Sequence, residues 1–459
     1  MATASSISAD PVLPEPPPSR LPQALSAFRH RNYRLFFFGQ LISVTGTWMQ
    51  SLAQAWLVLT LTSSAFLLGL VAVFQFTPIL LLGLVGGVIA DRVPKRNLLV
   101  ATQTCAGIQA SILATLVWTD RVELWHVYVL AFGLGTVNAF DMPTRQSFVF
   151  EMVGKDDLVN AVALNSALFN AARLVGPAVA GVILATVGIA ICFAINAVSY
   201  IAVIGGLLMM RVTRRAVARK RGGLGQLREG LGYVRQTPAV FLPIILVGFV
   251  ATFGMNFNSV WIPLLAKKEF DVGAGGFGVL MAALGIGSLC GAVLLAARAK
   301  RPRRSVLFGV AIAVGAIELM LALAGAIPLP LGAALVILPV LGFSTTTMMA
   351  MANSTVQTNA PDELRGRVMS VYMTVFGGTA PFGALLAGTT AKFLGTPASV
   401  AIGGFVTLFA AATIAITSGS IPWPVNRRPV VASPVPRTDP PPGDPPPARR
   451  EAAPASGHD

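Results

Sequence analysis

Charged residues are scarce in this chain: Asp, Glu, Lys and Arg make up 12% of its 459 residues, whereas hydrophobic residues make up 54%. Soluble domains carry roughly 25% charged residues, because water must solvate most of their surface. This chain lacks the polar material for such a surface. The composition therefore excludes an ordinary soluble protein and indicates a protein that lies in a lipid bilayer.

Cysteine and histidine are also rare, with three of each in the sequence. Cys105, Cys192 and Cys290 lie far apart inside apolar stretches, which favours simple packing over a disulfide or a metal site. No spaced set of metal ligands, nucleophile elbow or phosphate-binding loop occurs in the sequence. We therefore expect no enzyme activity, no cofactor and no metal ion.

Long apolar stretches are what the sequence has in quantity. A helix needs about 20 apolar residues to cross roughly 30 Å of hydrocarbon, and we count twelve such stretches between residues 34 and 420. Their centres lie near residues 47, 77, 108, 134, 174, 200, 252, 286, 315, 341, 378 and 408. Because these stretches lack the alternation of barrel strands, they predict an all-α membrane protein with twelve transmembrane helices.

Positive charge is concentrated in alternate connections between these stretches. With the N-terminus inside, four of the 34 Lys and Arg residues fall on the outer side and one, Arg173, falls within a span. The largest clusters, in residues 211–221 and 298–304, then lie in the cytosol, as the positive-inside rule requires. We expect these clusters to fix the orientation and to contact anionic lipid headgroups, and we expect no nucleic-acid partner.

The chain divides into two related halves around a long basic connector. A shift of 209 residues places Gly39 on Gly248 and Gly69 on Gly278, which predicts two six-helix pseudo-repeats of the kind that builds many transporters. The predicted segments are a flexible cytosolic N-terminal arm (1–33), an N-terminal six-helix bundle (34–211), a basic cytosolic connector (212–238), a C-terminal six-helix bundle (239–419) and a disordered proline-rich cytosolic tail (420–459).

A charged loop, GGVIADRVPKRN at residues 86–97, joins the second and third spans. It resembles the loop motif of the major facilitator superfamily, G-x3-D-[RK]-x-G-[RK]-[RK], with Pro94 where that family has glycine. The resemblance implies a cytosolic gate in which Asp91 locks against span eleven, while Lys95 or Arg96 meets Asp141 at the end of span four. The residues assigned to this gate are Gly87, Asp91, Arg92, Lys95, Arg96 and Asp141.

A second stretch, residues 140–181, resembles the branch of this superfamily that holds the enterobactin exporter, macrolide efflux pumps and transmembrane secretion effectors. Its later part is similar to the antiporter motif that is associated with export. The residues of this motif are Asn170, Arg173, Gly176, Pro177 and Gly181. An arginine at the centre of a span costs about 2.5 to 3.5 kcal/mol on insertion scales. Arg173 therefore serves conformational coupling or substrate recognition, or else is a satisfied structural cation.

The resemblance also implies a central cavity lined by spans one, four, seven and ten. The residues that these spans supply are Gln40, Thr45, Trp48, Gln50, Gln54, Asn138, Asn256, Phe257, Asn258, Ser344, Thr346, Met349 and Asn353. Their amides, hydroxyls, methionine and aromatic rings suit a bulky amphipathic substrate that is uncharged or weakly cationic. Each position can equally serve helix packing.

Glu318 is the one acidic residue clearly inside a span, so it is a candidate proton carrier. The alternative is a packing role, because the resemblance places span nine on the flank of the bundle. Drug–proton antiporters often carry an arginine in span four, and residues 127–140 have none.

Taken together, these features predict a monomeric secondary exporter of small molecules such as drugs or siderophores. It would exchange its substrate for protons by rocker-switch alternating access. We expect it to be a multi-pass protein of a bacterial cytoplasmic (inner) membrane, with both termini in the cytosol. Two alternatives stay open: a proton-coupled importer, and a membrane subunit of a larger transport or sensing complex.

Overall fold

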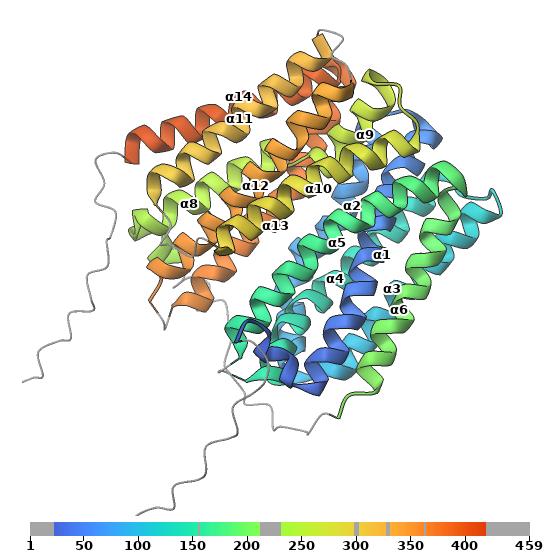
Figure 1. The fold of residues 1–459 in the computed structure, drawn as a ribbon, viewed down its shortest axis with the longest axis vertical. Helices are drawn as coiled ribbons and strands as arrows, with labels where there is room; N and C mark the ends of the chain where they lie inside the picture. Colours follow the sequence, from blue (N-terminus) through green and yellow to red (C-terminus); the bar gives the residue numbers. More distant parts are fainter. Residues whose placement is uncertain are drawn as a thin grey trace, which may run out of the picture. The chain divides into compact units, whose positions relative to one another are not determined.

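The computed structural model describes residues 23–154, 157–211, 231–297, 303–326, 331–361 and 364–418. The described residues all belong to one compact unit. Most of the predicted arm, connector and tail, namely residues 1–22, 212–230 and 419–459, lies outside the described residues. The compact unit, drawn in Figure 1, holds all the helices of the described residues.

The first half consists of one short 3-10 helix and six long α-helices. They are η1 (Gln23–Arg29), α1 (Arg31–Thr62), α2 (Ala65–Arg92), α3 (Lys95–Trp118), α4 (Leu124–Val153), α5 (Leu158–Thr186) and α6 (Ile189–Leu208). Each long helix covers one predicted span. Ser64 caps α2 by accepting a hydrogen bond from the backbone of Leu67, which allows the sharp turn between α1 and α2.

The second half also supplies six spans, but its first one is interrupted. This span seven is built from α8 (Pro238–Phe249), η2 (Val250–Gly254), η3 (Phe257–Trp261), α9 (Ile262–Leu264) and η4 (Leu265–Glu269), and the η segments are π-helical. The remaining spans are α10 (Ala274–Ala297), α11 (Arg304–Ala326), α12 (Leu331–Asn359), α13 (Arg365–Leu394) and α14 (Thr396–Thr417). The expectation of twelve helical spans is confirmed.

The 209-residue repeat of the sequence reappears in the helix boundaries. Helices α2 and α10 begin at Ala65 and Ala274, and helices α3 and α11 begin at Lys95 and Arg304. In each half the second helix packs along the fourth, as α2 does on α4 and α10 does on α12. The third and sixth helices pair likewise, so that α3 lies beside α6 and α11 lies beside α14 in Figure 1.

Ten of the described helical stretches are long and apolar enough to cross a membrane by length and composition. Helices α1 and α4 are as long as the others but are not among the ten. Polar residues lower the mean hydropathy of both helices, such as Gln50 and Gln54 in α1 and Asn138 and Asp141 in α4. Such helices are stable in a bilayer when their polar side chains point into the protein.

Two seams of small residues join the halves, and they are related by the repeat. In the α5–α10 seam, a Cβ atom on Gly181 would lie 2.5 Å from the Cα atom of Gly278. In the α2–α13 seam, a Cβ atom on Gly69 would lie 2.4 Å from the backbone oxygen of Ala384. Only glycine leaves room for such close helix contact. Gly69 and Gly278 occupy equivalent positions of the two halves.

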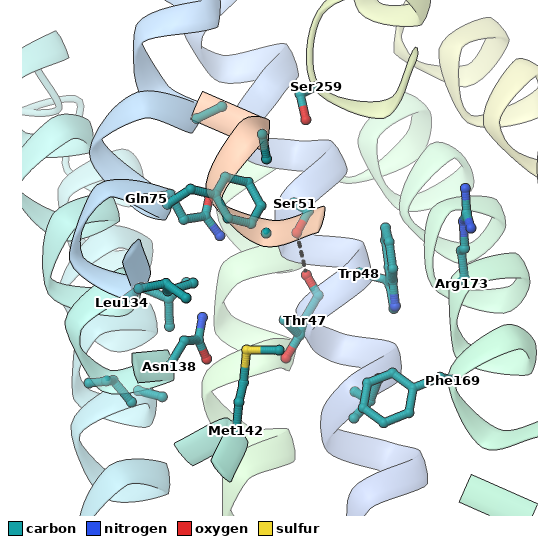
Figure 2. Close-up of a pocket in the computed structure, with 18 of the residues that line it drawn as sticks. Thr47, Trp48, Ser51, Gln75, Leu134, Asn138, Met142, Phe169, Arg173 and Ser259 are labelled. Carbon is teal, nitrogen blue, oxygen red and sulfur yellow. Dashed lines mark hydrogen bonds between the residues drawn. The ribbon is translucent and has the colours of Figure 1, made fainter. Parts of the chain in front are cut away.

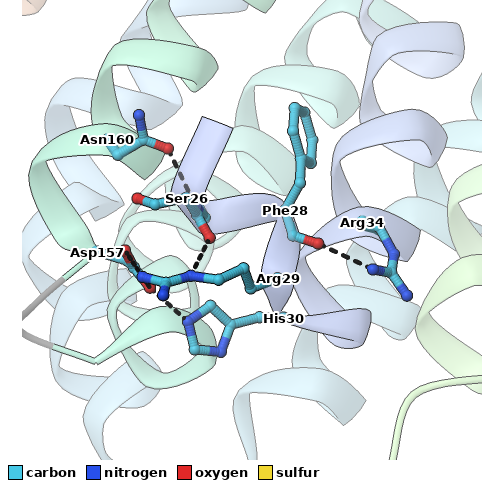
Figure 3. A network of polar contacts seen from close by, with 8 residues as sticks. Ser26, Phe28, Arg29, His30, Arg34, Asp157 and Asn160 are labelled. Carbon is cyan, nitrogen blue, oxygen red and sulfur yellow. Dashed lines mark hydrogen bonds and ion pairs between the residues drawn. The ribbon is translucent and has the colours of Figure 1, made fainter. Parts of the chain in front are cut away.

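A polar network anchors η1 to the start of α5, as Figure 3 shows. Arg29 and His30 each contact the Asp157 carboxylate, at 3.1 Å and 2.8 Å, and the backbone of Ala27 donates to Asn160. A hydrogen bond from Ser26, followed by those from His30 and Arg29, lowers the pKa of Asp157 to about 2 although burial opposes this shift. Helical structure thus begins at Gln23, within the segment predicted to be a flexible arm.

Candidate functional site

A cavity of about 610 Å³ lies between the two halves of the compact unit. Helices α1, α2, α4 and α5 form most of its wall, and span seven and α13 of the second half close it (Figure 2). Its polar lining residues are Ser43, Thr47, Ser51, Gln54, Gln75, Gln103, Asn138, Arg145, Gln146, Asn165, Arg173, Tyr200, Asn256 and Ser259. Aromatic and aliphatic side chains, among them Trp48, Phe76 and Phe169, fill the spaces between them.

Helical spacing explains why these side chains share one surface. Asn165, Phe169 and Arg173 recur every four residues on α5, and Thr47 and Ser51 do so on α1. Residues four apart lie one above the other on a helix, so each helix presents a strip to the cavity. The hydroxyls of Thr47 and Ser51 donate to backbone oxygens of their own helix, at 2.9 Å each, and the Thr47 hydroxyl also lies 3.4 Å from the hydroxyl of Tyr200.

Four of the residues assigned to the cavity from the sequence line it in the structure: Trp48, Gln54, Asn138 and Asn256. Gln50 instead points between helices, where it donates to Gln109 on α3 and accepts from Asn196 on α6. Its amide therefore holds three helices of the first half together. This is a packing role of the kind that the sequence left open.

The other assigned residues of spans one and seven also lie away from this cavity. Thr45 donates to the backbone oxygen of Leu41, and Gln40 is buried without a hydrogen-bond partner for either amide atom among the described residues. Phe257 is buried against Trp261, with 4.9 Å between the ring centroids. The side chain of Asn258 lies outside the part that the structure describes.

Span ten does not contribute to this cavity. Its four assigned residues, Ser344, Thr346, Met349 and Asn353, lie on α12, which packs mainly against α10 and α11. The second half instead reaches the cavity through α13, from Phe376 to Ala384. The reason is geometric: α13 crosses α2 at a glycine seam, which brings its backbone close to the first half.

Arg145 also lines the cavity, although no motif of the sequence marked it as a site residue. Helix α4 extends to Val153, so span four does carry an arginine, beyond the stretch at 127–140. Arg145 lines the cavity, forms an ion pair with Asp141, and places its guanidinium carbon 5.9 Å from the ring centroid of Phe169. The spacing of Asp141 and Arg145, four residues apart on one helix, is the sequence signal that reveals this pair.

The expected contact of Asp141 with Lys95 or Arg96 is wrong. Asp141 is fully buried and accepts hydrogen bonds from Thr102, at 2.9 Å, and Gln103, at 2.8 Å. Lys95 pairs with Glu151, which lies ten residues, or about 15 Å, further along α4. Asp141 is thus too deep in the bundle for the loop cations to reach.

The remaining residues of the charged loop lie at the end of the bundle. Arg96 donates to the backbone oxygens of Leu207 and Leu208, at 2.7 Å each, and so ties the start of α3 to the end of α6. Asp91 and Arg92 are exposed, and the described residues provide neither with a hydrogen bond or an ion pair. Gly87 has open space where a side chain would be. The expected lock between Asp91 and span eleven is not formed in this conformation.

The motif on α5 serves two different contacts. A Cβ atom on Gly176 would lie 2.7 Å from the backbone oxygen of Thr45, so this glycine lets α5 pack closely on α1. Pro177 and Gly181 face α10 at the α5–α10 seam. Asn170 donates to the backbone of Ser166 on its own helix.

Arg173 is the member of the motif that reaches the cavity. Its guanidinium carbon lies 5.7 Å from the ring centroid of Trp48, close enough for a cation–π contact. Among the described residues it has no ion pair and no hydrogen bond. Figure 2 shows Arg173 and Phe169 on one helix, with Trp48 beside them.

Glu318 lies outside the cavity, in the core of the second half. It is fully buried on α11, and neither carboxylate oxygen has a hydrogen-bond partner among the described residues. A Cβ atom on Gly254 would lie 2.7 Å from the hydroxyl oxygen of Thr407 and 2.9 Å from Glu318 Oε1. The carboxyl group therefore packs against the π-helical part of span seven.

Three comparisons with known proteins bear on this chain. The family model described as "Transmembrane secretion effector" matches residues 22–427. The multidrug efflux pump Tap of Mycolicibacterium fortuitum is 30% identical over 382 residues, which are 80% of this chain and 90% of that protein. The staphyloferrin A transporter of Staphylococcus aureus is 25% identical over 386 residues, or 82% and 93% of the two chains. Macrolide efflux protein A of Streptococcus pyogenes is 21% identical over 381 residues, or 80% and 92%.

Solved structures share the fold at much lower sequence identity. A bacterial homologue of the human lysosomal transporter Spinster superposes with a TM-score of 0.67 at 14% identity, over 87% of this chain and 98% of that one. The nucleoside transporter NupG superposes with a TM-score of 0.66 at 12% identity, over 87% and 100% of the two chains. These likenesses establish the arrangement of the helices.

Proposed function

The chain belongs to the transmembrane secretion effector family of the major facilitator superfamily, and from this premise we propose that it exports bulky amphipathic small molecules by proton antiport. The family resemblance of the sequence is confirmed, and the protein is a membrane transporter rather than an enzyme. Its relatives include proteins named as multidrug and macrolide efflux pumps. The geometry of the cavity supports a bulky amphipathic substrate, and the contacts between the halves support transport by alternating access.

The observation that carries the proposal is the cavity between the halves. At about 610 Å³ it has the size of a pocket for a drug-like molecule, and its wall mixes amides, hydroxyls and aromatic rings. Such a lining tolerates substrates of different shapes, because rings and amides contact many groups without a fixed geometry. A cavity at the interface of two six-helix repeats is also where alternating access operates.

The inter-half contacts support a conformation that is open towards the basic end of the bundle. The seam residues Gly69 and Gly278 lie near the starts of α2 and α10, next to the α1–α2 connection. At that same end, Lys267 donates to the backbone oxygen of Leu59. The positive-inside rule places the opposite, basic end in the cytosol. We therefore interpret this conformation as closed to the outside and open to the cytosol.

Rocker-switch exchange then requires a lock that forms when the cytosolic side closes. Asp91 is unpaired and exposed here among the described residues, as expected for an open gate. On closure its carboxylate would dock at the first turn of α13, which begins at Arg365 and presents the positive end of a helix dipole. The α5–α10 and α2–α13 seams would open in the same step.

Proton coupling needs an acid that changes its protonation as the halves move. Glu318 remains our candidate, because its carboxyl group packs against the interrupted part of span seven, where a helix can change its bend. A charge that crosses roughly 100 mV releases about 2.3 kcal/mol, enough for a substrate gradient of about fiftyfold. The alternative for Glu318 is packing alone, and a Glu318→Gln variant separates the two roles because glutamine cannot release a proton.

We place the protein in a bacterial cytoplasmic membrane as a monomer, with both termini in the cytosol and with basic clusters on anionic headgroups. The proposal is tested by substrate accumulation in cells that lack the gene and in cells that overproduce it, with and without an uncoupler. Export predicts higher accumulation of the substrate in the deletion strain, and an equal level in both strains once the uncoupler is present.

Lower accumulation in the deletion strain would instead establish import. A membrane subunit of an ATP-driven exporter would keep its activity in the presence of the uncoupler and would copurify with an ATPase. Either result would overturn proton-driven export by this chain alone.

A further inference from the structure

The cavity carries charge of one sign. Among its described lining residues there are two arginines, Arg145 and Arg173, and no Asp, Glu, Lys or His. Asp141, the acid paired with Arg145, is fully buried and is not among the residues that line the cavity. One guanidinium group thus faces the cavity without a compensating carboxylate among the described residues.

Arg173 is the uncompensated group. It lies in the middle of α5, 15 residues or about 22 Å from the start of that helix at Leu158. Its contact is the face of the Trp48 ring, 5.7 Å from the guanidinium carbon. A ring orients a guanidinium but accepts none of its five N–H donors. At this depth in a bilayer, an arginine requires a counter-charge or water.

Arg145 also retains a free donor. Its Nη2 atom bonds Asp141, whereas its Nε atom is buried and has no hydrogen-bond partner in the described part of the chain. Arg145 lies eight residues, or about 12 Å, from the end of α4 at Val153, so it is nearer the basic end than Arg173. A molecule that enters from the basic end meets Arg145 first and Arg173 second.

Aromatic rings connect the two arginines. Phe169 lies one helical turn from Arg173 on α5, and its ring centroid is 5.9 Å from the guanidinium carbon of Arg145. Trp48 covers Arg173 from the side of α1, as Figure 2 shows. The rings give an apolar body a surface to pack on while its polar end approaches a guanidinium group.

We propose that the transported substrates are amphipathic organic acids, with a carboxylate bound by Arg173 and an aromatic or aliphatic body packed on Trp48 and Phe169. A guanidinium matches a carboxylate with two parallel N–H···O bonds, and the low dielectric of the membrane interior strengthens them. The same charge repels cations, so this inference replaces the weakly cationic substrate expected from the sequence. It rests on the proposed export function and names the substrate class of that site.

The membrane potential favours the export of a negatively charged substrate. The cytosol of a respiring cell is at negative potential, so an anion that leaves it moves down the electrical gradient. A cationic substrate would have to move against the same gradient.

The test is binding to the full-length protein in lipid nanodiscs at about pH 7, with three matched probes. These are a naphthalene-based carboxylic acid dye, its methyl ester, and the analogue in which a primary amine replaces the acid. We expect the acid to bind at least tenfold more tightly than the ester or the amine. Arg173→Gln should weaken binding of the acid by at least tenfold and change binding of the ester by less than twofold, whereas Arg173→Lys should retain an intermediate preference.

Lys392→Gln is the matched control. Lys392 also lies over aromatic rings, 5.5 Å from Phe66 and 5.2 Å from Phe393, but it is not among the residues that line the cavity. Its removal should leave the preference for the acid unchanged. The affinities of the acid and the ester can also be compared in the unmodified protein alone. The inference therefore stays testable if the Arg173→Gln variant fails to insert into the membrane.

Equal or tighter binding of the ester or the amine would overturn the acid preference. If cells nevertheless export a neutral drug in an uncoupler-sensitive manner, the proposed export function stands and only the substrate class is wrong. If no probe binds and no compound is exported, both proposals fail.

Discussion

Gly181 on α5 and Gly278 on α10 are in backbone contact across the two halves: a Cβ atom on Gly181 would come within 2.5 Å of the Cα atom of Gly278. Gly278 is the repeat equivalent of Gly69, which makes the matching contact with Ala384 on α13. Each half therefore offers a glycine near the start of its second helix to the fifth helix of the other half. In the proposed transport cycle, these two seams must separate whenever the outer side opens.

Gly181→Leu should prevent the α5–α10 seam from closing. The added side chain would meet backbone atoms, which cannot move aside, so the closed seam should lose about 1 to 3 kcal/mol. We expect transport to fall at least tenfold, with labelling of introduced cysteines from the outside increased. Gly309→Leu is the control, because a Cβ atom at Gly309 meets nothing within 4 Å. Unchanged labelling in Gly181→Leu would show that the seam does not control outer closure.

Asp91→Asn should reduce efflux strongly while leaving the protein inserted. The change removes the charge that would dock at the start of α13 in the closed gate, and in the present conformation Asp91 has no partner to lose among the described residues. Efflux rate and membrane abundance are measured together. Glu151→Gln, which removes only the pairing with Lys95, should have a smaller effect. Normal efflux by Asp91→Asn would remove Asp91 from the gate.

The pair of Asp141 and Arg145 can be tested by a double-mutant cycle. Arg145→Gln leaves a buried carboxylate with only Thr102 and Gln103 as partners, so it should cost about 3 to 5 kcal/mol of stability. The double variant with Asp141→Asn leaves no unpaired charge and should recover most of this loss. Thermal unfolding in detergent measures the loss of stability in each single variant and in the double variant. Additive losses would show that the two groups do not interact.

Glu318→Gln separates proton carriage from packing. Glutamine keeps the shape and the burial of the side chain but cannot release a proton. If Glu318 carries the proton, the variant should lose uphill efflux driven by a pH gradient and should retain substrate exchange without a gradient. A pH-driven efflux rate within twofold of the unmodified protein would assign Glu318 to packing against Gly254 and Thr407.

The stability that Asp157 contributes by anchoring η1 to α5 should depend on pH. Because the pKa of Asp157 falls from its usual 3.8 to about 2 on folding, its contribution to stability is complete above pH 3.8 and is lost as the pH falls through about 2. The thermal stability of the unmodified protein should therefore fall between pH 6 and pH 2 by an amount that is absent in the Asp157→Asn variant. The variant should instead be less stable already at pH 6. Identical pH profiles would exclude this contribution of Asp157.

The sequence by itself determined the number of spans, their approximate centres and the relation between the halves. Apolar length and the placement of Lys and Arg are local properties that can be counted along the chain. The predicted shift of 209 residues then reappears in the helices that start at Ala65 and Ala274. The family resemblance came from the charged loop at residues 86–97 and the stretch at residues 140–181. Asn138 and Trp48 were also assigned to a cavity that they do line in the structure.

Only the tertiary structure decided which side of each helix faces which neighbour. A polar residue such as Gln50 can line a cavity or bridge helices, and the rotation of α1 against α3 and α6 made it a bridge. The depth of Asp141 excluded Lys95 as its partner and assigned it to Arg145. These outcomes depend on helix rotation, tilt and close packing at glycines, which are set by contacts between residues far apart in the chain.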